Sequence, residues 1–219
     1  MPSPRLEADH SGPGPMELLL GRRSPSALVE PAPTPEELDI MLRAATSVPD
    51  HGRLQPWRFV VAQQDGRARL GDALVGALLE VEPDASEAMI DKMRRKAFVA
   101  PTMIVLVASP RASSKVPRWE QVASAACAGY AIILAARALG LGAVWKSTTI
   151  RHGAQLVDLL AMTGTEELLG WVNVGGAVDG TTDERTRPEP DLARLVTVLD
   201  GVGSRSYASR ARSAGTTRR

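Results

Sequence analysis

Three short polar clusters contain the residues best suited to chemistry. They are GRRS at residues 21–24, PDHGRLQPW at 49–57 and WKS at 145–147. Two adjacent arginines followed by a serine offer charge-assisted and hydroxyl hydrogen bonds to a phosphate, and the planar guanidinium group matches phosphate geometry. Alone, such an arginine pair is usually a solvated surface feature, so its meaning depends on the other two clusters.

His51 lies among residues that favour turns. Pro49, Asp50, Gly52 and Pro56 surround it, and all four are common in turns and loops. A histidine of the core is expected instead inside a helical or alternating apolar pattern. The sequence therefore predicts that a loop presents His51, with a core histidine as the alternative.

The strong motifs of several other chemistries are absent from the sequence. It contains no GxxxxGK[ST] loop, HExxH helix, GxSxG elbow or CxxC pair. These absences argue against P-loop nucleotide hydrolysis, zinc proteolysis, serine hydrolysis and a cysteine metal site. The single cysteine, Cys127, lies in an alanine-rich apolar run. We expect it to be a small buried core residue, with a nucleophile as the alternative.

Composition and charge indicate a globular, cytoplasmic protein. Of the 219 residues, 44% are hydrophobic, enough for a sizeable core. The most apolar stretch, AACAGYAIILAA, stops at Arg137, short of the roughly 18 to 20 residues of a membrane span. The net charge is +1, but five arginines lie within residues 204–219 and leave the rest slightly acidic. We therefore expect partners other than nucleic acid or membrane.

Hydrophobic periodicity predicts helices that alternate with four strands. The firmest helix begins in PTPEELDIMLRAATS, where Thr34 suits the N-cap, Pro35 the first helical position and Glu37 a capping box. The apolar run at 103–109 has the length and β-branched character of a central strand covered on both faces. We expect further helices near 16–21, 65–81, 86–100, 116–140 and 152–162, and further strands at 59–62, 142–147 and 168–178.

This order of elements predicts a layered α/β or α+β fold with a small sheet between helices. Residues 16–200 are expected to form one domain. Residues 1–15 carry four prolines and no long apolar segment, so we expect a disordered leader. Residues 201–219 are rich in arginine and are expected to be a basic disordered tail.

The three clusters lie in segments that resemble one known family. The run ELLLGRRSPSALVEPAPTPEELDIMLRAATSVPDHGRLQPWRFVV resembles the opening of the FMN-dependent nitroreductase family, in its compact bacterial branch. The segments KVPRWEQ at 115–121 and LGLGAVWKS at 139–147 resemble that branch in the same order. The resemblance extends over residues 16–178, and the motifs are specific only in combination.

The resemblance implies an α+β three-layer sandwich with a small, mainly antiparallel sheet between helices. It also implies an intertwined homodimer with FMN bound at the subunit interface. Arg22 and Ser24 match the positions that hold the FMN phosphate, and Arg23 matches the position beside the ribityl chain and the ring.

The other two clusters are also implied to contact the flavin. Pro49, Asp50 and His51 match a loop that approaches it from the partner subunit, and the segment Trp145, Lys146 and Ser147 passes close to it. One departure concerns the fourth residue before the loop histidine. The compact branch often has an arginine there, and this chain has Ser47.

The implied function is transfer of hydride from NADH or NADPH, through bound FMN, to an electron-poor acceptor such as a nitro compound or quinone. The cycle is expected to be ping-pong, with no side chain acting as acid or base, because the cofactor carries the hydride chemistry. Two alternatives stay open because a fold does not fix a function. They are a flavin-binding redox sensor and another flavin-modifying activity.

Overall fold

The computed structural model describes residues 14–178, 189–200 and 203–207. The chain forms two compact units, Met1–Glu184 and Arg185–Arg219. The helices of the first unit are α1 (Pro15–Leu20), α2 (Pro35–Ala45), α3 (Asp65–Val81), α4 (Glu87–Arg95), α5 (Arg118–Ala138) and α6 (Ala154–Leu159), with 3₁₀ turns η1 (His51–Arg53) and η2 (Lys96–Phe98). Its strands are β1 (Leu28–Val29), β2 (Trp57–Gln63), β3 (Thr102–Ala108), β4 (Gly142–Lys146) and β5 (Glu167–Ala177).

The five strands form one antiparallel sheet with β5 at its centre. The strand order is β1-β5-β3-β2, and β4 also pairs with β5. One edge of β5 pairs with β3, while β4 and β1 follow one another along the other edge. The strand β4 pairs with β5 along one edge, and its other edge pairs with no strand among the described residues.

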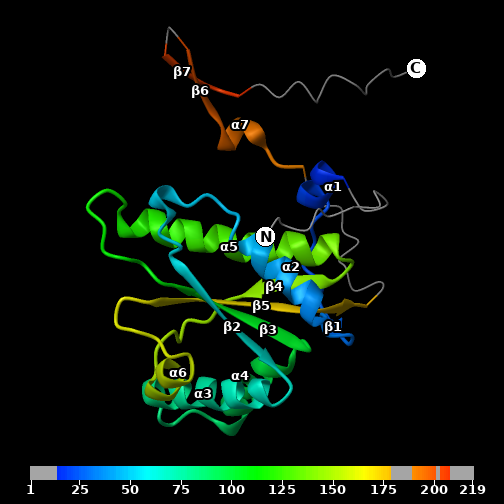
Figure 1. Cartoon of the computed structure of the whole chain (residues 1–219), viewed down its shortest axis with the longest axis vertical. Helices are drawn as coiled ribbons and strands as arrows, with labels where there is room; N and C mark the ends of the chain where they lie inside the picture. Colours follow the sequence, from blue (N-terminus) through cyan, green and yellow to red (C-terminus); the bar gives the residue numbers. More distant parts are fainter. Residues whose placement is uncertain (1–13, 179–188, 201–202, 208–219) are drawn as a thin grey trace, which may run out of the picture. The chain divides into compact units, whose positions relative to one another are not determined.

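Helices cover both faces of the sheet (Figure 1). The helices α3, α4 and α6 lie on one face, and α2 and α5 lie on the other. Successive residues of β3 face opposite layers: Met103 and Val105 pack with the first, and Ile104 and Ala108 with the second. A strand buried on both faces is a continuous apolar run. The predicted central strand and the α+β sandwich are thereby confirmed.

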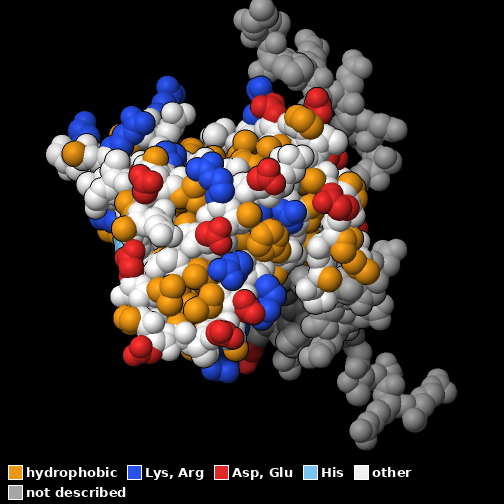
Figure 2. All heavy atoms as spheres, turned by 90° about the horizontal axis from the view of Figure 1, so that it is seen from below, with side chains coloured by type: hydrophobic (Ala, Val, Ile, Leu, Met, Phe, Trp, Pro, Cys, Tyr) orange, Lys and Arg blue, Asp and Glu red, His pale blue; other side chains and the backbone are white. Residues whose placement is uncertain are grey.

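The outer face of the α3, α4 and α6 layer is seen in Figure 2. Acidic and basic side chains lie interspersed on this face, with smaller hydrophobic groups between them. This mixture is an ordinary solvated surface and differs from the basic stripe that binds nucleic acid.

The helix α2 has the predicted N-terminus. The backbone N–H of Glu37 donates to Thr34 Oγ1 at 3.2 Å, and the backbone N–H of Thr34 donates to Glu37 Oε2 at 2.8 Å. Two of the N–H groups at the helix N-terminus are thereby satisfied. The helix ends at Ala45, before the loop that contains His51.

The helix α5 is the longest of the described residues and the one among them long and apolar enough to cross a membrane. Its buried residues Ala125, Ala128, Ile132 and Ala136 belong to the core between the sheet and the layer of α2 and α5, and 39% of its most apolar window is buried. Cys127 is exposed, so the prediction of a buried cysteine is wrong. A helix that is apolar on all sides does not reveal from its sequence which side is buried.

The second unit contains α7 (Leu192–Leu195), β6 (Thr197–Asp200) and β7 (Gly203–Ser206). The two strands form an antiparallel pair, which was not predicted from the sequence. The expected boundary between residues 200 and 201 falls inside this pair. Residues 1–13 of the expected leader and 208–219 of the expected tail lie outside the described residues.

Candidate functional site

The first cluster follows directly after α1. A Cβ atom at Gly21 would lie 2.6 Å from the carbonyl of Glu17 and 2.8 Å from Arg137 Nη2, so this residue borders the end of the Arg137 side chain. Arg22 Nη1 donates to Ser24 Oγ at 3.1 Å, and Arg23 Nη1 donates to the carbonyl of Arg22 at 3.0 Å. The structure therefore brings the three predicted phosphate-binding residues together, near the C-terminal end of α5.

The histidine loop is a fixed turn. The Asp50 carboxylate accepts hydrogen bonds from the backbone N–H groups of Leu54 at 3.1 Å and Gln55 at 2.8 Å. Gly52 has φ 76° and Arg53 has φ 53°, a conformation that is uncommon for residues other than glycine. Such strained backbone persists where the surroundings hold it and is frequent at functional sites. The prediction that a loop presents His51 is confirmed.

The side chain of His51 lies on the surface beside the N-terminal part of α5. It is 58% exposed, and its Nδ1 is 2.8 Å from Glu120 Oε1. The Ser124 hydroxyl donates to the carbonyl of Pro49 and joins the loop to the same helix. The core-histidine alternative is therefore wrong. A pocket of about 240 Å³ is lined here by residues that include Pro49, Asp50, His51, Glu120, Ser124 and Cys127.

In the third cluster, neighbouring side chains belong to opposite faces of the sheet. A Cβ atom at Gly129 would lie 2.8 Å from Trp145 Cζ3, and Trp145 Nε1 donates to the carbonyl of Leu169 at 3.2 Å. The indole is therefore packed toward α5. Because successive side chains of a strand alternate, Lys146 faces the other layer. There Lys146 and Ser147 line a pocket, and the Trp145 side chain does not.

The pocket at the end of β4 has a volume of about 140 Å³. It is lined by Lys96, Val99, Lys146, Ser147, Trp171 and Asn173. Burial lowers the pKa of Lys96, and repulsion from Lys92 lowers it further. Neither pocket lysine forms an ion pair with an acidic residue in the described part of the chain. We call this group the lysine pocket.

Two buried side chains of the lysine pocket lack hydrogen-bond partners among the described residues. Asn173 is fully buried and Trp171 is 2% exposed. Asn173 Oδ1, Asn173 Nδ2 and Trp171 Nε1 make no hydrogen bond. Neither Asn173 nor Lys96 was predicted from the sequence. Asn173 was detectable as a polar residue inside an apolar strand, whereas Lys96 follows the basic run KMRR and resembles a surface residue.

The three clusters do not form one pocket within a single chain. The histidine loop contacts Glu120 and Ser124, whereas Gly21 contacts Arg137. Glu120 and Arg137 are 17 residues apart in α5, which is about 25 Å along a helix. The histidine loop and the arginine cluster therefore lie toward opposite ends of the same helix.

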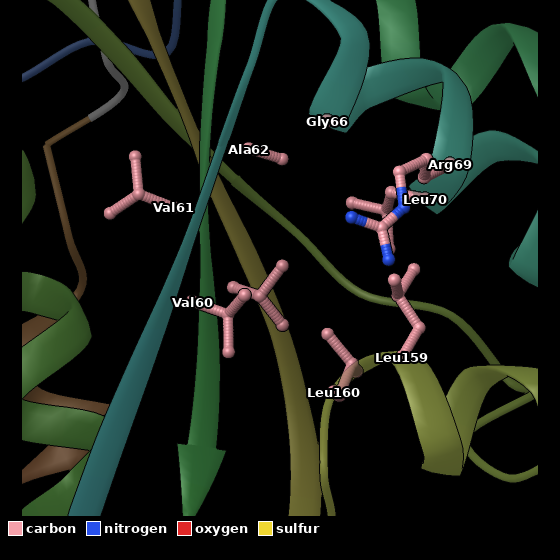
Figure 3. Close-up of a pocket in the computed structure, with 9 residues that line it drawn as sticks. Val60, Val61, Ala62, Gly66, Arg69, Leu70, Leu159 and Leu160 are labelled. Carbon is pink, nitrogen blue, oxygen red and sulfur yellow. The ribbon is translucent and has the colours of Figure 1, made fainter.

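A separate apolar pocket lies beside the edge strand β2. Its volume is about 170 Å³, and residues of β2, α3 and the end of α6 line it. Arg69 is the one charged side chain among the residues labelled in Figure 3. None of the residues predicted for the functional site lines this pocket.

Comparison with known proteins gives one consistent result. A model described as the nitroreductase family matches residues 19–176. "Putative NAD(P)H nitroreductase YdjA" of Escherichia coli strain K12 is 39% identical over 160 residues, which cover 73% of this chain and 86% of that protein. A similarly named protein of Haemophilus influenzae is 34% identical over 165 residues, covering 75% of this chain and 89% of its own length.

Solved structures share the fold. A nitroreductase-like family protein from Bacillus cereus superposes with a TM-score of 0.73 at 23% identity, covering 89% of this chain and all of that chain. A single-residue mutant of an FMN and NADPH-dependent nitroreductase, NfnB, from "sphigopyxis sp. strain HMH" has a TM-score of 0.62 at 19% identity. It covers 83% of this chain and 96% of its own. At sequence identities of 23% and 19%, these two structures show the fold alone.

Proposed function

Since this chain belongs to the nitroreductase family, we propose that it is an FMN-dependent oxidoreductase. It takes hydride from NADH or NADPH and passes it to an electron-poor small molecule such as a nitro compound or quinone. Membership of the family supports oxidoreduction with NAD(P)H. The acceptor and the ping-pong order of the cycle belong to the proposal.

The observation that carries the proposal is the placement of two polar groups along β4. A Cβ atom at Gly142 would lie 3.3 Å from Pro25 Cγ, so the segment after Ser24 borders the start of the strand. Lys146 and the lysine pocket lie at its end. Four residues of strand span about 13 Å. This spacing suits an elongated ligand with a phosphate at one end and a ring at the other.

The residues present fit the two ends of FMN. Arg22, Arg23 and Ser24 would hold the phosphate through charge-assisted and hydroxyl hydrogen bonds. Lys146 would lie at the ring, where a positive charge favours the anionic reduced form. When bound, FMN supplies the hydride chemistry, and the chain supplies position, electrostatics and exclusion of water.

A homodimer is part of the proposal. Pro49, Asp50 and His51 lie about 25 Å along α5 from the arginine cluster of their own chain. If both groups contact one flavin, the histidine loop that reaches it must come from a partner subunit. The Ser47 hydroxyl donates to the carbonyl of Ala44 at 2.8 Å.

The first experiment is an anaerobic visible spectrum of the purified protein with FMN, before and after NADH and then NADPH. We expect bound flavin that bleaches and then recovers with a nitroaromatic compound or quinone. Bound flavin that never bleaches would favour the redox sensor or another flavin-modifying activity. Failure to bind FMN would contradict the proposal.

The phosphate assignment has its own test. Arg22→Ala should weaken FMN binding by about ten- to a hundredfold, since a charge-assisted hydrogen bond contributes about 1.5–3 kcal/mol. Binding of riboflavin, which lacks the phosphate, should change little. Arg43→Ala is a matched control, because Arg43 pairs with Asp39 on the surface of α2 and should leave both affinities unchanged. Equal losses for FMN and riboflavin in Arg22→Ala would contradict the assignment.

A further inference from the structure

The apolar pocket beside β2 reaches the core of the first unit. Its lining includes Leu70, Val105 and Leu160, which are at most 3% exposed. Protein interiors are close-packed, and a space that reaches core side chains leaves them without contact atoms on one side. An opening of about 170 Å³ at this depth can therefore take an apolar group from outside the chain.

Arg69 supplies a positive charge at this pocket. Figure 3 shows its guanidinium group turned from α3 toward Leu159 and Leu160. The Arg69 side chain forms no ion pair with any acid of the described residues. An arginine fork matches the two oxygens of a carboxylate. The pocket therefore combines an apolar interior with a single cation suited to an acid.

The other charged groups near the pocket do not take the place of such an acid. Arg58 donates to both oxygens of Glu166 and to the carbonyl of Leu160, so the charges of this pair offset one another. Asp65 lies in α3 one helical turn before Arg69, yet it forms no ion pair with Arg69 in the structure. The carboxylate that Arg69 accepts must come from a ligand.

The pocket is separate from the proposed flavin site. The strands β2 and β4 are separated by β3 and β5, which is about 14 Å at roughly 4.8 Å between neighbouring strands. The outer edge of β2 pairs with no strand among the described residues, so no sheet partner covers this side of the pocket. A ligand here therefore occupies a second site and requires no flavin.

The size of the pocket selects a small ligand. Pockets that enclose drug-sized molecules have about 300–1,000 Å³, whereas this pocket has about 170 Å³, enough for one ring or a short branched chain. We propose that it binds a small amphipathic monocarboxylate. The apolar group packs against Leu70, Val105 and Leu160, and the carboxylate pairs with Arg69. This inference goes beyond the proposed function and does not depend on it.

Three probes test the site in the unmodified protein. Phenylacetate has both features, 2-phenylacetamide has the same ring and shape without the charge, and acetate has the charge without the ring. Their dissociation constants are measured by NMR chemical-shift titration of the isotope-labelled full chain, with and without FMN. The titration resolves the site, and the FMN-free arm keeps the result independent of the proposed function.

We expect phenylacetate to bind about fivefold more tightly than 2-phenylacetamide, because an exposed ion pair contributes up to about 1 kcal/mol. Acetate should bind more weakly than either. The shifts should centre on β2, the N-terminal part of α3 and the end of α6. Equal affinities for the two aromatic probes, or shifts centred on another part of the chain, would overturn the proposal.

The variant Arg69→Met tests the charge, because methionine keeps an apolar stem and lacks the guanidinium group. Phenylacetate should then bind as weakly as 2-phenylacetamide, whose own affinity should not change. A matched control is Arg95→Met, which removes an arginine that is 69% exposed on α4 and should leave both affinities unchanged. If Arg69→Met retained the preference for phenylacetate, Arg69 would have no role in binding.

The variant Gly66→Leu tests the pocket itself. Gly66 lines it, and a Cβ atom there would lie 3.9 Å from Ala62 Cβ, which is an ordinary contact. A leucine side chain has room to fill the pocket, and replacement of glycine inside a helix favours the folded state. Both aromatic probes should lose their binding at this site while urea denaturation shows an intact fold. Undiminished binding to the folded variant would contradict the assignment of the pocket.

Discussion

Two buried carboxamides in the same unit have opposite surroundings. Gln121 Oε1 accepts from the N–H of Arg111 at 2.8 Å, and Nε2 donates to the carbonyls of Arg111 at 3.0 Å and Val116 at 3.1 Å. The Asn173 carboxamide makes no hydrogen bond among the described residues. The first side chain fixes the segment before α5, and the second has no such partner. Burial alone therefore does not reveal whether a polar side chain is bonded within the fold.

A second satisfied group lies between β2 and the segment before β5. Arg58 Nε and Nη2 donate to the two oxygens of Glu166 at 2.8 Å each, and Nη2 also donates to the carbonyl of Leu160 at 2.9 Å. The Glu166 side chain is 4% exposed. The Arg58 side chain is 33% exposed, but its removal is costly because the buried Glu166 charge is left uncompensated. The Arg58–Glu166 pair is therefore expected to contribute strongly to the stability of the fold.

The largest expected effect is therefore that of Arg58→Met. Loss of one partner of a buried pair costs about 3–5 kcal/mol, so urea denaturation should reveal a fall of that size in the free energy of unfolding. Arg94→Met is the control, because Arg94 is 45% exposed and pairs with acids at 3.3 Å or more. Its loss should stay below about 1 kcal/mol. Similar losses in both variants would remove the distinction between the two kinds of ion pair.

The same pair predicts how stability depends on pH. Hydrogen bonds from Arg58 lower the pKa of Glu166 from 4.5 to about 2. A depressed carboxyl pKa contributes stability above the unfolded value, and this contribution is lost as the pH falls from about 4.5 through about 2. We expect a loss of about 3 kcal/mol from this group. The gap in stability between the wild type and Glu166→Gln, measured by urea denaturation, should narrow over this range, and a constant gap would contradict the assignment.

The two carboxamides can be compared directly by the same substitution. Gln121→Leu leaves three backbone groups without their partner, so we expect a loss of about 2 kcal/mol in the free energy of unfolding. Asn173→Leu breaks no bond, so the cofactor-free protein should be unchanged or slightly more stable. Denaturation of both variants without flavin tests this. A large loss in Asn173→Leu would indicate a structural role for Asn173.

The smallest expected effect on stability is that of His51→Ala. The His51–Glu120 pair is largely exposed, and such pairs contribute at most about 1 kcal/mol. If the loop contacts flavin as proposed, the variant should bind FMN several-fold more weakly while remaining folded. Fluorescence titration and urea denaturation measure the two properties separately. Unfolding without loss of flavin affinity would reverse this interpretation.

Much of the fold was predictable because its local signals are strong. The capping box of Thr34 and Glu37 and the apolar run of β3 each fix an element by a local mechanism. The two-residue strand β1 was not predicted, because two residues are too short to show a period. The expected helix 86–100 is divided into α4 and η2, a change that hydrophobic periodicity does not reveal.

The site was predictable only in part, because its residues depend on tertiary packing. Arg22, Arg23 and Ser24 are adjacent in sequence and were recognisable as a unit. Lys96 and Asn173 join Lys146 only after β5 has paired with β4 and η2 has packed nearby. The roles predicted for Pro49, Asp50 and His51, and for Trp145, Lys146 and Ser147, stay predictions until flavin binding is measured.

The central position of β5 has a consequence for biosynthesis. This strand pairs with β1, β3 and β4, yet it is the last strand of the sheet to be translated. At about 5–20 residues per second, β3 emerges roughly 3 to 14 s before β5 is complete. During that time one edge of the very apolar β3 has no partner, and unpaired edges promote aggregation. A nascent chain that stalls before residue 167 is therefore expected to require chaperones, however stable the finished protein is.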